Sequence, residues 1–434
     1  MEILVPVKNP KMSVELFDSS SEKQKYLIRL GKKQWVVSYI IYEILNNIDG
    51  KKNITEITES VNSKASIMIK QEDITTIIEK TLIPNKLINS DDDSHSEEEL
   101  KKDKSLWFRV NILKSHIVQK FSFLCFFYTK KVALILGPLA IISQLYILAV
   151  SMSSSGINNI FSTGTKGIIC MFVISTVVTL FHELGHASAS MYYNVKPGDI
   201  GIGIYYMIPV YYSDVSSIWA LNRKQRVVVD IGGMYFQAIM IAVLLLISLA
   251  TKNNYIYTAV CILCINNFYN INPFIKLDGY WIFSDFIGVP NLHDIMKAYF
   301  NKKVLRRNDI RIDRLLDGFI NSMRKKEKLL FYIYIGFSMC FVVFVAYFTT
   351  NLLFSCVVKA KEFYSMVLIN MNLGLKSTVY EVIRWLYNNT MYAISVLFFI
   401  KMTYSFISRV IVSLKNMILK RWGAKNEKNN KYVQ

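Results

Sequence analysis

Two histidines flank a glutamate in the segment His182-Glu183-Leu184-Gly185-His186. The chain has only five histidines, and these two stand four residues apart. On an α-helix this spacing brings both imidazoles to one face, about one turn apart, where they can bind one metal ion. Glu183 then projects beside them, where it can act as a general base towards a water molecule. These residue types at this spacing predict the chemistry of a zinc hydrolase.

The motif lies at the end of an uncharged apolar run, residues 167–181. A run of this kind is typical of a helix in a membrane, and ionisable side chains that continue it are costly unless they are paired or ligate an ion. The alternative is a pair of solvated histidines at the membrane surface. We favour the metal site, because ligation of an ion offsets the cost of placing these ionisable groups at the membrane.

The composition predicts a chain in two parts. With 434 residues, 52% of them hydrophobic, and a mean hydropathy of +0.29, it is too apolar for an ordinary soluble enzyme and too charged for a membrane bundle throughout. Residues 1–105 carry 16 Lys/Arg and 18 Asp/Glu, net −2, and the remainder carries 35 and 14, net +21. The positive charge therefore belongs to the apolar part, where it indicates topology rather than nucleic-acid binding.

The N-terminus and the cysteines indicate the compartment. Residues 1–20 lack a basic start, an apolar core and a small-residue cleavage site, so we expect no secretory signal and a cytoplasmic first domain. The six cysteines lie in apolar or aromatic segments, which indicates reduced packing residues rather than disulfides. Cys261 and Cys264 form a C-x-x-C pair, but their apolar flanks and the lack of a second pair make a zinc ribbon or redox pair the weaker interpretation.

Apolar segments long enough to cross a membrane follow residue 130. Five segments are clear: 132–152, 167–189, 227–250, 255–271 and 329–357. A sixth, at about 385–406, is interrupted by Lys401. The fold class is therefore predicted as mainly α, a polytopic helical membrane protein with about six transmembrane helices and a small N-terminal α+β domain. Its parts would be a core at 107–290 and, at 291–434, a basic loop with C-terminal transmembrane helices.

Loop charge predicts the orientation of the spans. Residues 302–328 hold ten Lys/Arg, whereas 153–166 and 251–254 hold one lysine each. The basic loop should lie in the cytoplasm, and with it both termini of a multi-pass protein of the cell membrane.

This topology predicts a third ligand. The second and fourth spans then run in the same direction, so the end that carries the histidines and the end that carries Asp278 meet on one side of the membrane. Catalytic zinc needs three protein ligands and a free fourth position, and Asp278 is the acidic group at the right level. The alternative is that Asn272-Pro273 and Asp278-Gly279 are ordinary helix-stop and turn pairs.

Residues 1–90 read as a winged-helix-like domain. Two short strands are expected at 25–30 and 34–37, and three helices at 38–48, 53–62 and 71–83. Asn53 and Glu56 form a capping box at the start of the second helix. The acidic run that follows predicts a solvated linker at 91–106, in which His95 is a weak metal candidate. Residues 107–127, aromatic and basic by turns, predict a helix or elbow along the membrane surface.

The pair HELGH and Asn272-Pro273-Phe274-Ile275-Lys276-Leu277-Asp278-Gly279 resembles the H-E-x-x-H and N-P-x-x-x-x-D-G signatures of the site-2 protease family of intramembrane zinc metalloproteases. The resemblance covers about residues 132–285. It implies one zinc ion per chain bound by His182, His186 and Asp278, with Glu183 as the general base and Asn272 beside the substrate carbonyl. Gly232-Gly233 would match the small-residue contact of the family core, although an ordinary small-residue helix contact explains it equally well.

The strand pair followed by YEILNNIDGKKNITEITESV resembles the PqqD-like recognition domains, which bind leader peptides of ribosomally made, modified peptides. Such domains add the leader as an extra strand, so the chain as a whole resembles the peptide zinc metalloproteases encoded with such peptides. This implies a precursor peptide as substrate, and a peptide exporter as a further partner. A DNA-binding winged helix is the alternative, but a segment of net charge −2 lacks the basic face that phosphates require. We therefore expect no nucleic-acid partner.

Residues 196–219 are β-like and aromatic. They would either present a strand edge that holds a peptide extended near the site, or form an interfacial aromatic belt. Three functions follow from all these features together. The first is a membrane-embedded zinc endopeptidase that matures a secreted peptide of the bacteriocin or pheromone kind. The second cleaves a membrane-anchored regulator, and the third is a non-catalytic transporter or immunity protein that keeps a metal site.

Overall fold

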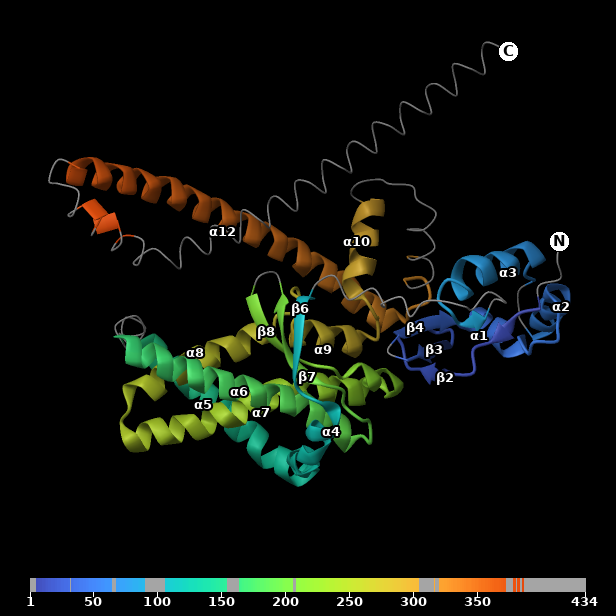
Figure 1. Cartoon of the computed structure of the whole chain (residues 1–434), viewed down its shortest axis with the longest axis horizontal. Coiled ribbons are helices and arrows are strands. Elements are labelled where there is room, and N and C mark those ends of the chain that lie inside the picture. The colour runs from blue at the N-terminus through green and yellow to red at the C-terminus, as the bar shows by residue number, and fades with distance from the viewer. Residues whose placement is uncertain are drawn as a thin grey trace, which may run out of the picture. The chain divides into compact units, whose positions relative to one another are not determined.

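The computed structural model describes residues 5–31, 33–64, 68–89, 106–153, 164–205, 208–303, 316, 320–371, 378–379, 381–382 and 385. The described chain is mainly helical, with a small α+β region at its N-terminus (Figure 1). It divides into two compact units, Met1–Ile335 and Gly336–Gln434. The predicted acidic linker, most of the basic loop, and the predicted sixth span apart from Trp385 lie outside the described residues.

The N-terminal α+β region, residues 5–89, is called the N-terminal domain below. It holds a three-stranded antiparallel sheet in the order β2-β3-β4, and its first and last strands, β1 and β5, pair with each other. The strands are β1 (Val7–Lys8), β2 (Met12–Phe17), β3 (Lys25–Leu30), β4 (Lys33–Ser38) and β5 (Ile88–Asn89). The helices are α1 (Tyr39–Asn47), α2 (Ile54–Lys64), α3 (Gln71–Ile77) and the π-helical turn η1 (Ile78–Leu82). The two predicted strands are β3 and β4, and the three predicted helices are present, the third continued by η1; β1, β2 and β5 are additional strands.

Local sequence explains these elements. Asn53 Oδ1 accepts a hydrogen bond from the Glu56 amide at 2.9 Å and Glu56 Oε2 accepts one from the Asn53 amide at 3.0 Å, so the predicted capping box starts α2. The buried faces of the sheet and helices then form one apolar core. Its buried members are Ile28, Ile44, Leu45, Ile48, Ile57, Val61, Ile74, Ile78, Leu82, Leu87 and Ile88.

A helical bundle forms the centre of the first unit (Figure 1). Its helices are α5 (Lys130–Ser153), α6 (Gly164–Tyr192), α7 (Arg223–Thr251) and α8 (Asn254–Asn270), and α7 packs against the other three. In the described chain, four helices are long and apolar enough to span a membrane: α5, α6, α7 and the segment Lys325–Phe348. The fourth predicted span, α8, has 17 residues and reaches about 26 Å, slightly less than a bilayer core.

The prediction of a surface helix or elbow at residues 107–127 is partly wrong. Its first half is a strand, β6 (Leu106–Leu113), in which Phe108, Val110 and Ile112 alternate with polar residues. Only the second half is helical, as α4 (Ser115–Val118) and η2 (Gln119–Tyr128). The strand forms because it pairs with β7 (Ile200–Tyr205), which also pairs with β8 (Ile208–Ser213). The β-like region expected at 196–219 thus supplies β7 and β8, followed by the 3-10 helix η4 (Ser216–Ala220).

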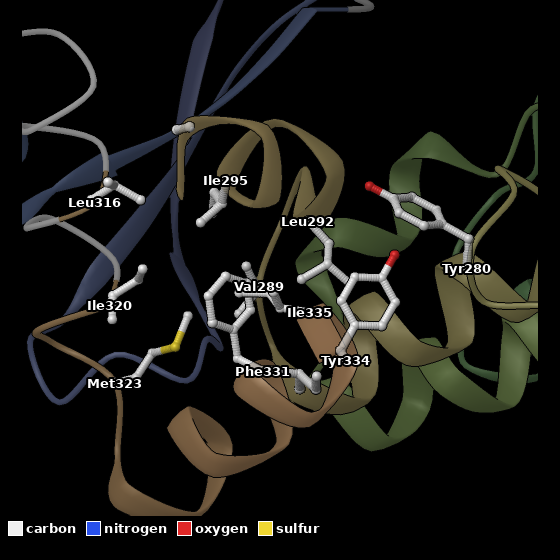
Figure 2. Packing of buried hydrophobic residues seen from close by; sticks show 12 residues of the cluster. Tyr280, Val289, Leu292, Ile295, Leu316, Ile320, Met323, Phe331, Tyr334 and Ile335 are labelled. Atoms are coloured by element: carbon white, nitrogen blue, oxygen red, sulfur yellow. The ribbon is translucent and has the colours of Figure 1, made fainter. Parts of the chain in front are cut away.

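Three further helices follow the bundle: α9 (Asp278–Ile287), α10 (Leu292–Lys303) and α12 (Lys325–Met371). Figure 2 shows that Tyr280 of α9, Leu292 of α10 and Phe331 of α12 share one apolar core, and each of the three is fully buried. The Tyr280 hydroxyl also accepts a hydrogen bond from the His293 amide at 3.2 Å. Burial raises the pKa of Tyr280 to about 12, so this hydroxyl stays neutral. Helix α9 is therefore fixed from its first turn onwards.

Candidate metal centre

Helix α6 carries His182, Glu183 and His186 in its buried second half. Their exposed fractions are 5%, 8% and 8%. The helix continues without a break from the apolar run to Tyr192, as the sequence predicted. The two imidazoles lie one turn apart on the face that packs against α7.

Asp278 meets both histidines. Its Oδ2 lies 3.0 Å from His182 Nε2 and its Oδ1 lies 3.5 Å from His186 Nε2. The two Nε2 atoms are 3.2 Å apart. The structure thus brings together the three residues that the sequence predicted as metal ligands, although 92 residues separate His186 from Asp278.

The chain turns sharply to deliver Asp278. Asn272 Oδ1 accepts a hydrogen bond from the Phe274 amide at 2.9 Å, which closes an Asx turn after α8. Gly279 then passes so close to the end of α8 that a Cβ there would lie 2.1 Å from the carbonyl oxygen of Ile271. The Asn-Pro and Asp-Gly pairs are therefore turn-forming residues, and the second pair also places a carboxylate at the histidines. The predicted catalytic role of Asn272 stays a prediction.

Hydrogen bonds to the other ring nitrogens fix both imidazoles. His186 Nδ1 lies 2.8 Å from the carbonyl oxygen of Val229, which can only accept, so Nδ1 carries the proton. His182 Nδ1 lies 2.9 Å from Gln237 Oε1, and the amide group of Gln237 donates to the carbonyl oxygen of Leu263 at 3.2 Å. Both Nδ1 atoms are therefore donors. In neutral rings this leaves both Nε2 lone pairs directed into the site.

This donor set fits a zinc ion. Two ligand atoms of tetrahedral zinc stand about 3.3 Å apart, close to the separations of 3.0, 3.2 and 3.5 Å described above. Asp278 Oδ2 is buried and receives no hydrogen bond from the described residues. Two nitrogen lone pairs and a carboxylate repel one another at this range unless a cation lies between them.

Glycines let α6 and α7 approach closely enough to form the site. A Cβ on Gly185 would lie 2.3 Å from the carbonyl oxygen of Gly232, and a Cβ on Gly233 would lie 2.3 Å from His186 Nε2 and 2.5 Å from His182 Nε2. The Tyr128 hydroxyl joins the two helices, since its one hydrogen is shared between the carbonyl oxygens of Gly185 at 2.7 Å and Gly232 at 3.3 Å. Of the two predicted glycines, Gly232 makes a helix contact and Gly233 leaves room for the imidazoles.

Two residues that support the site were not predicted from the sequence. Gln237 is an amide within the apolar run of α7, and such a polar residue in a membrane helix is itself a signal of a buried partner. Val229 contributes only its main-chain carbonyl, for which side-chain identity gives no signal.

The C-x-x-C pair is not part of this centre. Cys264 Sγ contacts the carbonyl oxygen of Gln144, and Cys261 Sγ contacts the hydroxyl of Ser151. The cysteines whose side chains the structure describes are free thiols, and Cys261 and Cys264 pack in the bundle core. These two cysteines are packing residues, as predicted.

Comparison with known proteins shows a partial similarity to a curated protein. No protein-family model and no solved structure matches the chain. Over 137 residues, 31% of this chain, it is 23% identical to the Bacillus subtilis (strain 168) protein named "Putative peptide zinc metalloprotease protein YydH". The match covers 54% of that protein, so the chain spans about half the length of the curated relative. At the coarse level the similarity supports a protease role and zinc as the metal.

Proposed function

We propose that this chain is a membrane-embedded zinc endopeptidase that cleaves a ribosomally made precursor peptide during maturation of a modified, secreted peptide. The observation that carries the proposal is the convergence of His182, His186 and Asp278 with both Nδ1 atoms already used as donors. The name of the curated relative agrees with this reading.

In this proposal the residues of α6, of α9 and of the turn before α9 have different roles in the reaction. His182, His186 and Asp278 hold one zinc ion, which supplies Lewis acidity towards the scissile carbonyl when bound. Glu183, buried beside the two histidines, accepts a proton from the water that attacks the carbonyl carbon and then donates it to the leaving amine. Asn272 stands in the turn before Asp278, where it would contact the substrate carbonyl. The net reaction is hydrolysis of a peptide bond.

The membrane is the proposed setting of this chemistry. Large apolar side chains cover the outer faces of the spans, among them Leu134, Ile135, Ile142 and Phe172 with exposed fractions of 75%, 69%, 62% and 72%. A lipid environment removes such surface from water. We place the protein in the cell membrane as a multi-pass protein with both termini in the cytoplasm, because the basic loop after α10 favours that side.

The N-terminal domain would bind the precursor. Its sheet has the order β2-β3-β4, so two strands lie at edges to which an extended peptide can add. Strand β8 is likewise an edge strand of the sheet β6-β7-β8, and it packs against α6, which carries Glu183. A peptide held extended at these edges presents its backbone to the site. A peptide exporter is the further proposed partner.

Replacement of Glu183 by glutamine tests the reaction. We expect the purified variant to keep about one zinc per chain, because the three ligands are unchanged, and to lose cleavage by a factor of about a thousand or more. Metal content is measured by mass spectrometry, and peptides from cells that make either protein are compared by the same method. The matched control is Glu59→Gln, an exposed residue on α2. Cleavage by Glu183→Gln at the wild-type rate would refute the proposal.

The same peptide comparison separates the alternative functions. Accumulation of an uncleaved leader-bearing peptide in the Glu183→Gln cells supports precursor maturation. Accumulation of a membrane-anchored protein fragment would instead support a regulatory protease. Full cellular function of the variant would support the non-catalytic transporter or immunity protein.

A further inference from the structure

A buried arginine joins the N-terminal domain to helices α7 and α9. Arg226, in the first turn of α7, is only 1% exposed, and each guanidinium nitrogen has a separate partner. Its Nε donates to Asp285 Oδ1 at 2.7 Å, its Nη1 to the carbonyl oxygen of Leu221 at 2.9 Å, and its Nη2 to the carbonyl oxygen of Asp18 at 3.0 Å. The guanidinium carbon also lies 4.8 Å from the centre of the Phe17 ring. One side chain thus links α9, the entry to α7 and the N-terminal domain.

Arg226 contacts Phe17, the last residue of β2, and Asp18, which begins the link to β3. We call residues 17–22 the connector, and other residues of it make further contacts. The Asp18 carboxylate accepts a hydrogen bond from the Arg223 amide at 3.0 Å and lies 3.4 Å from Arg223 Nε. Ser20 donates its amide and its hydroxyl to the carbonyl oxygen of Gly288 at 3.0 and 3.2 Å. Gly288 directly follows α9, and Asp18 accepts its hydrogen bond from the first amide of α7, beside the N-cap residue Asn222. The connector therefore contacts the two helices that serve the metal ligands.

Each of these two helices leads from the arginine to the metal site. On α7, Arg226 stands one turn before Val229, whose carbonyl oxygen holds His186. On α9, Asp285 stands two turns after Asp278 in a helix of ten residues. A shift of α9 or α7 along its axis would move a ligand or the acceptor that orients one.

We propose that Arg226 is a positioning residue that fixes α7 and α9 against the connector, so that the N-terminal domain is a structural part of the metal centre as well as a site for peptide binding. This inference rests on the proposed function, because it assumes that His182, His186 and Asp278 bind zinc. Removal of Arg226 also leaves Asp285 buried without its cationic partner.

Arg226→Gln in the full chain, purified in detergent, tests the proposal. We expect the zinc affinity, measured by competition with a chelator, to fall about tenfold, and the absorption spectrum of the Co²⁺-substituted protein to change. Arg226→Lys keeps the charge but not three separately directed donor groups, so it should give an intermediate affinity. The control is Lys224→Gln, an exposed residue in the same turn of α7, which should leave both properties unchanged.

Asp18→Ala tests the contact between the connector and α7 by a change in the connector. It also provides a test if Arg226→Gln does not fold. Asp18 is 43% exposed at its side chain, so the variant leaves the buried arginine and its partners in place. We expect the zinc affinity to fall about threefold. Glu59→Ala, on the exposed face of α2 in the same domain, is the control and should have no effect.

The results separate this inference from the proposed function. If the wild-type protein binds zinc while folded Arg226→Lys and Asp18→Ala keep its affinity and its Co²⁺ spectrum, the arginine has only a stabilising role and the inference is overturned. If the wild-type protein binds no zinc, the proposed function is overturned and the inference falls with it. A zinc-binding wild type with weakened variants supports the inference whether or not a peptide is cleaved.

Discussion

The contact between α6 and α7 and the core of the N-terminal domain are built on opposite principles. In the domain, eleven buried apolar side chains fill the space between sheet and helices. Beside the histidines, glycines let the backbones of α6 and α7 approach closely, and polar groups of Tyr128 and Gln237 form hydrogen bonds with the backbones and with an imidazole. The first arrangement follows from burial of apolar surface. The second is required by the site, because the polar ring nitrogens of two histidines must fit between two helices.

This difference predicts that a small substitution has a greater effect in the α6–α7 contact than in the core of the N-terminal domain. An apolar core can partly relax around a lost methyl group, at a cost in stability. At Gly185 and Gly233 the α6–α7 contact has little room to relax, since the backbone of Gly232 and two hydrogen-bonded imidazoles lie where a methyl group would go. Substitutions there should therefore affect the metal centre more than the stability of the chain.

The largest effect is expected for Gly233→Ala. The added methyl group would lie within 2.5 Å of both Nε2 atoms, so the rings must move, and a displacement of this size lowers cleavage by about a hundredfold or more. Zinc content of the purified variant should fall as well. Gly137→Ala in α5, where the methyl group meets no atom within 4 Å, is the matched control. A Gly233→Ala protein with full zinc content would contradict the comparison.

A smaller effect is expected for Gln237→Leu. The leucine keeps the approximate volume but leaves His182 Nδ1 without its acceptor, so zinc affinity should fall between about tenfold and a hundredfold. Gln144→Leu is the control, because Gln144 accepts a hydrogen bond from Asn267 elsewhere in the same bundle. Equal zinc affinities in the two variants would show that the amide at position 237 does not orient the ring.

The smallest effect is expected for Asn53→Ala in the N-terminal domain. Loss of the capping box should destabilise α2 by about 1 kcal/mol and leave the zinc affinity unchanged. Hydrogen exchange of the α2 amides, followed by mass spectrometry, measures the first effect, and Thr55→Ala in the same turn is the control. A change in zinc affinity would mean that the domain acts on the metal centre by routes other than the connector.

Local patterns predicted the features that depend on neighbouring residues. The capping box of α2, the strands β3 and β4, and the helix that carries His182 and His186 all follow from short-range periodicity and capping. The position of Asp278 beside the histidines followed from counting spans, because alternate spans end on the same side of a membrane. The structure places Asp278 beside both histidines, although α8 is slightly short for a bilayer, and the direction of the spans stays a prediction.

Non-local contacts explain what was missed. Strand β6 pairs with β7, which lies more than 80 residues further along the chain, and its alternating residues were read as a surface helix or elbow. The acceptors of the two Nδ1 atoms come from α7, one of them from the main chain of Val229, so no spacing within α6 could identify them. The bonds of Arg226 to Asp285 and Asp18 likewise join residues far apart in sequence.

The Tyr128 hydroxyl has a consequence for the order in which the protein assembles. Tyr128 precedes α5, yet its two acceptors are carbonyl groups of Gly185 and Gly232, and the second is made more than 100 residues later. The Gly185 acceptor is available once α6 has been made, whereas the Gly232 acceptor becomes available only after the first third of α7. Both hydrogen bonds of the phenol therefore require α6 and α7 to lie side by side, and a nascent chain halted before Gly232 cannot complete the pair.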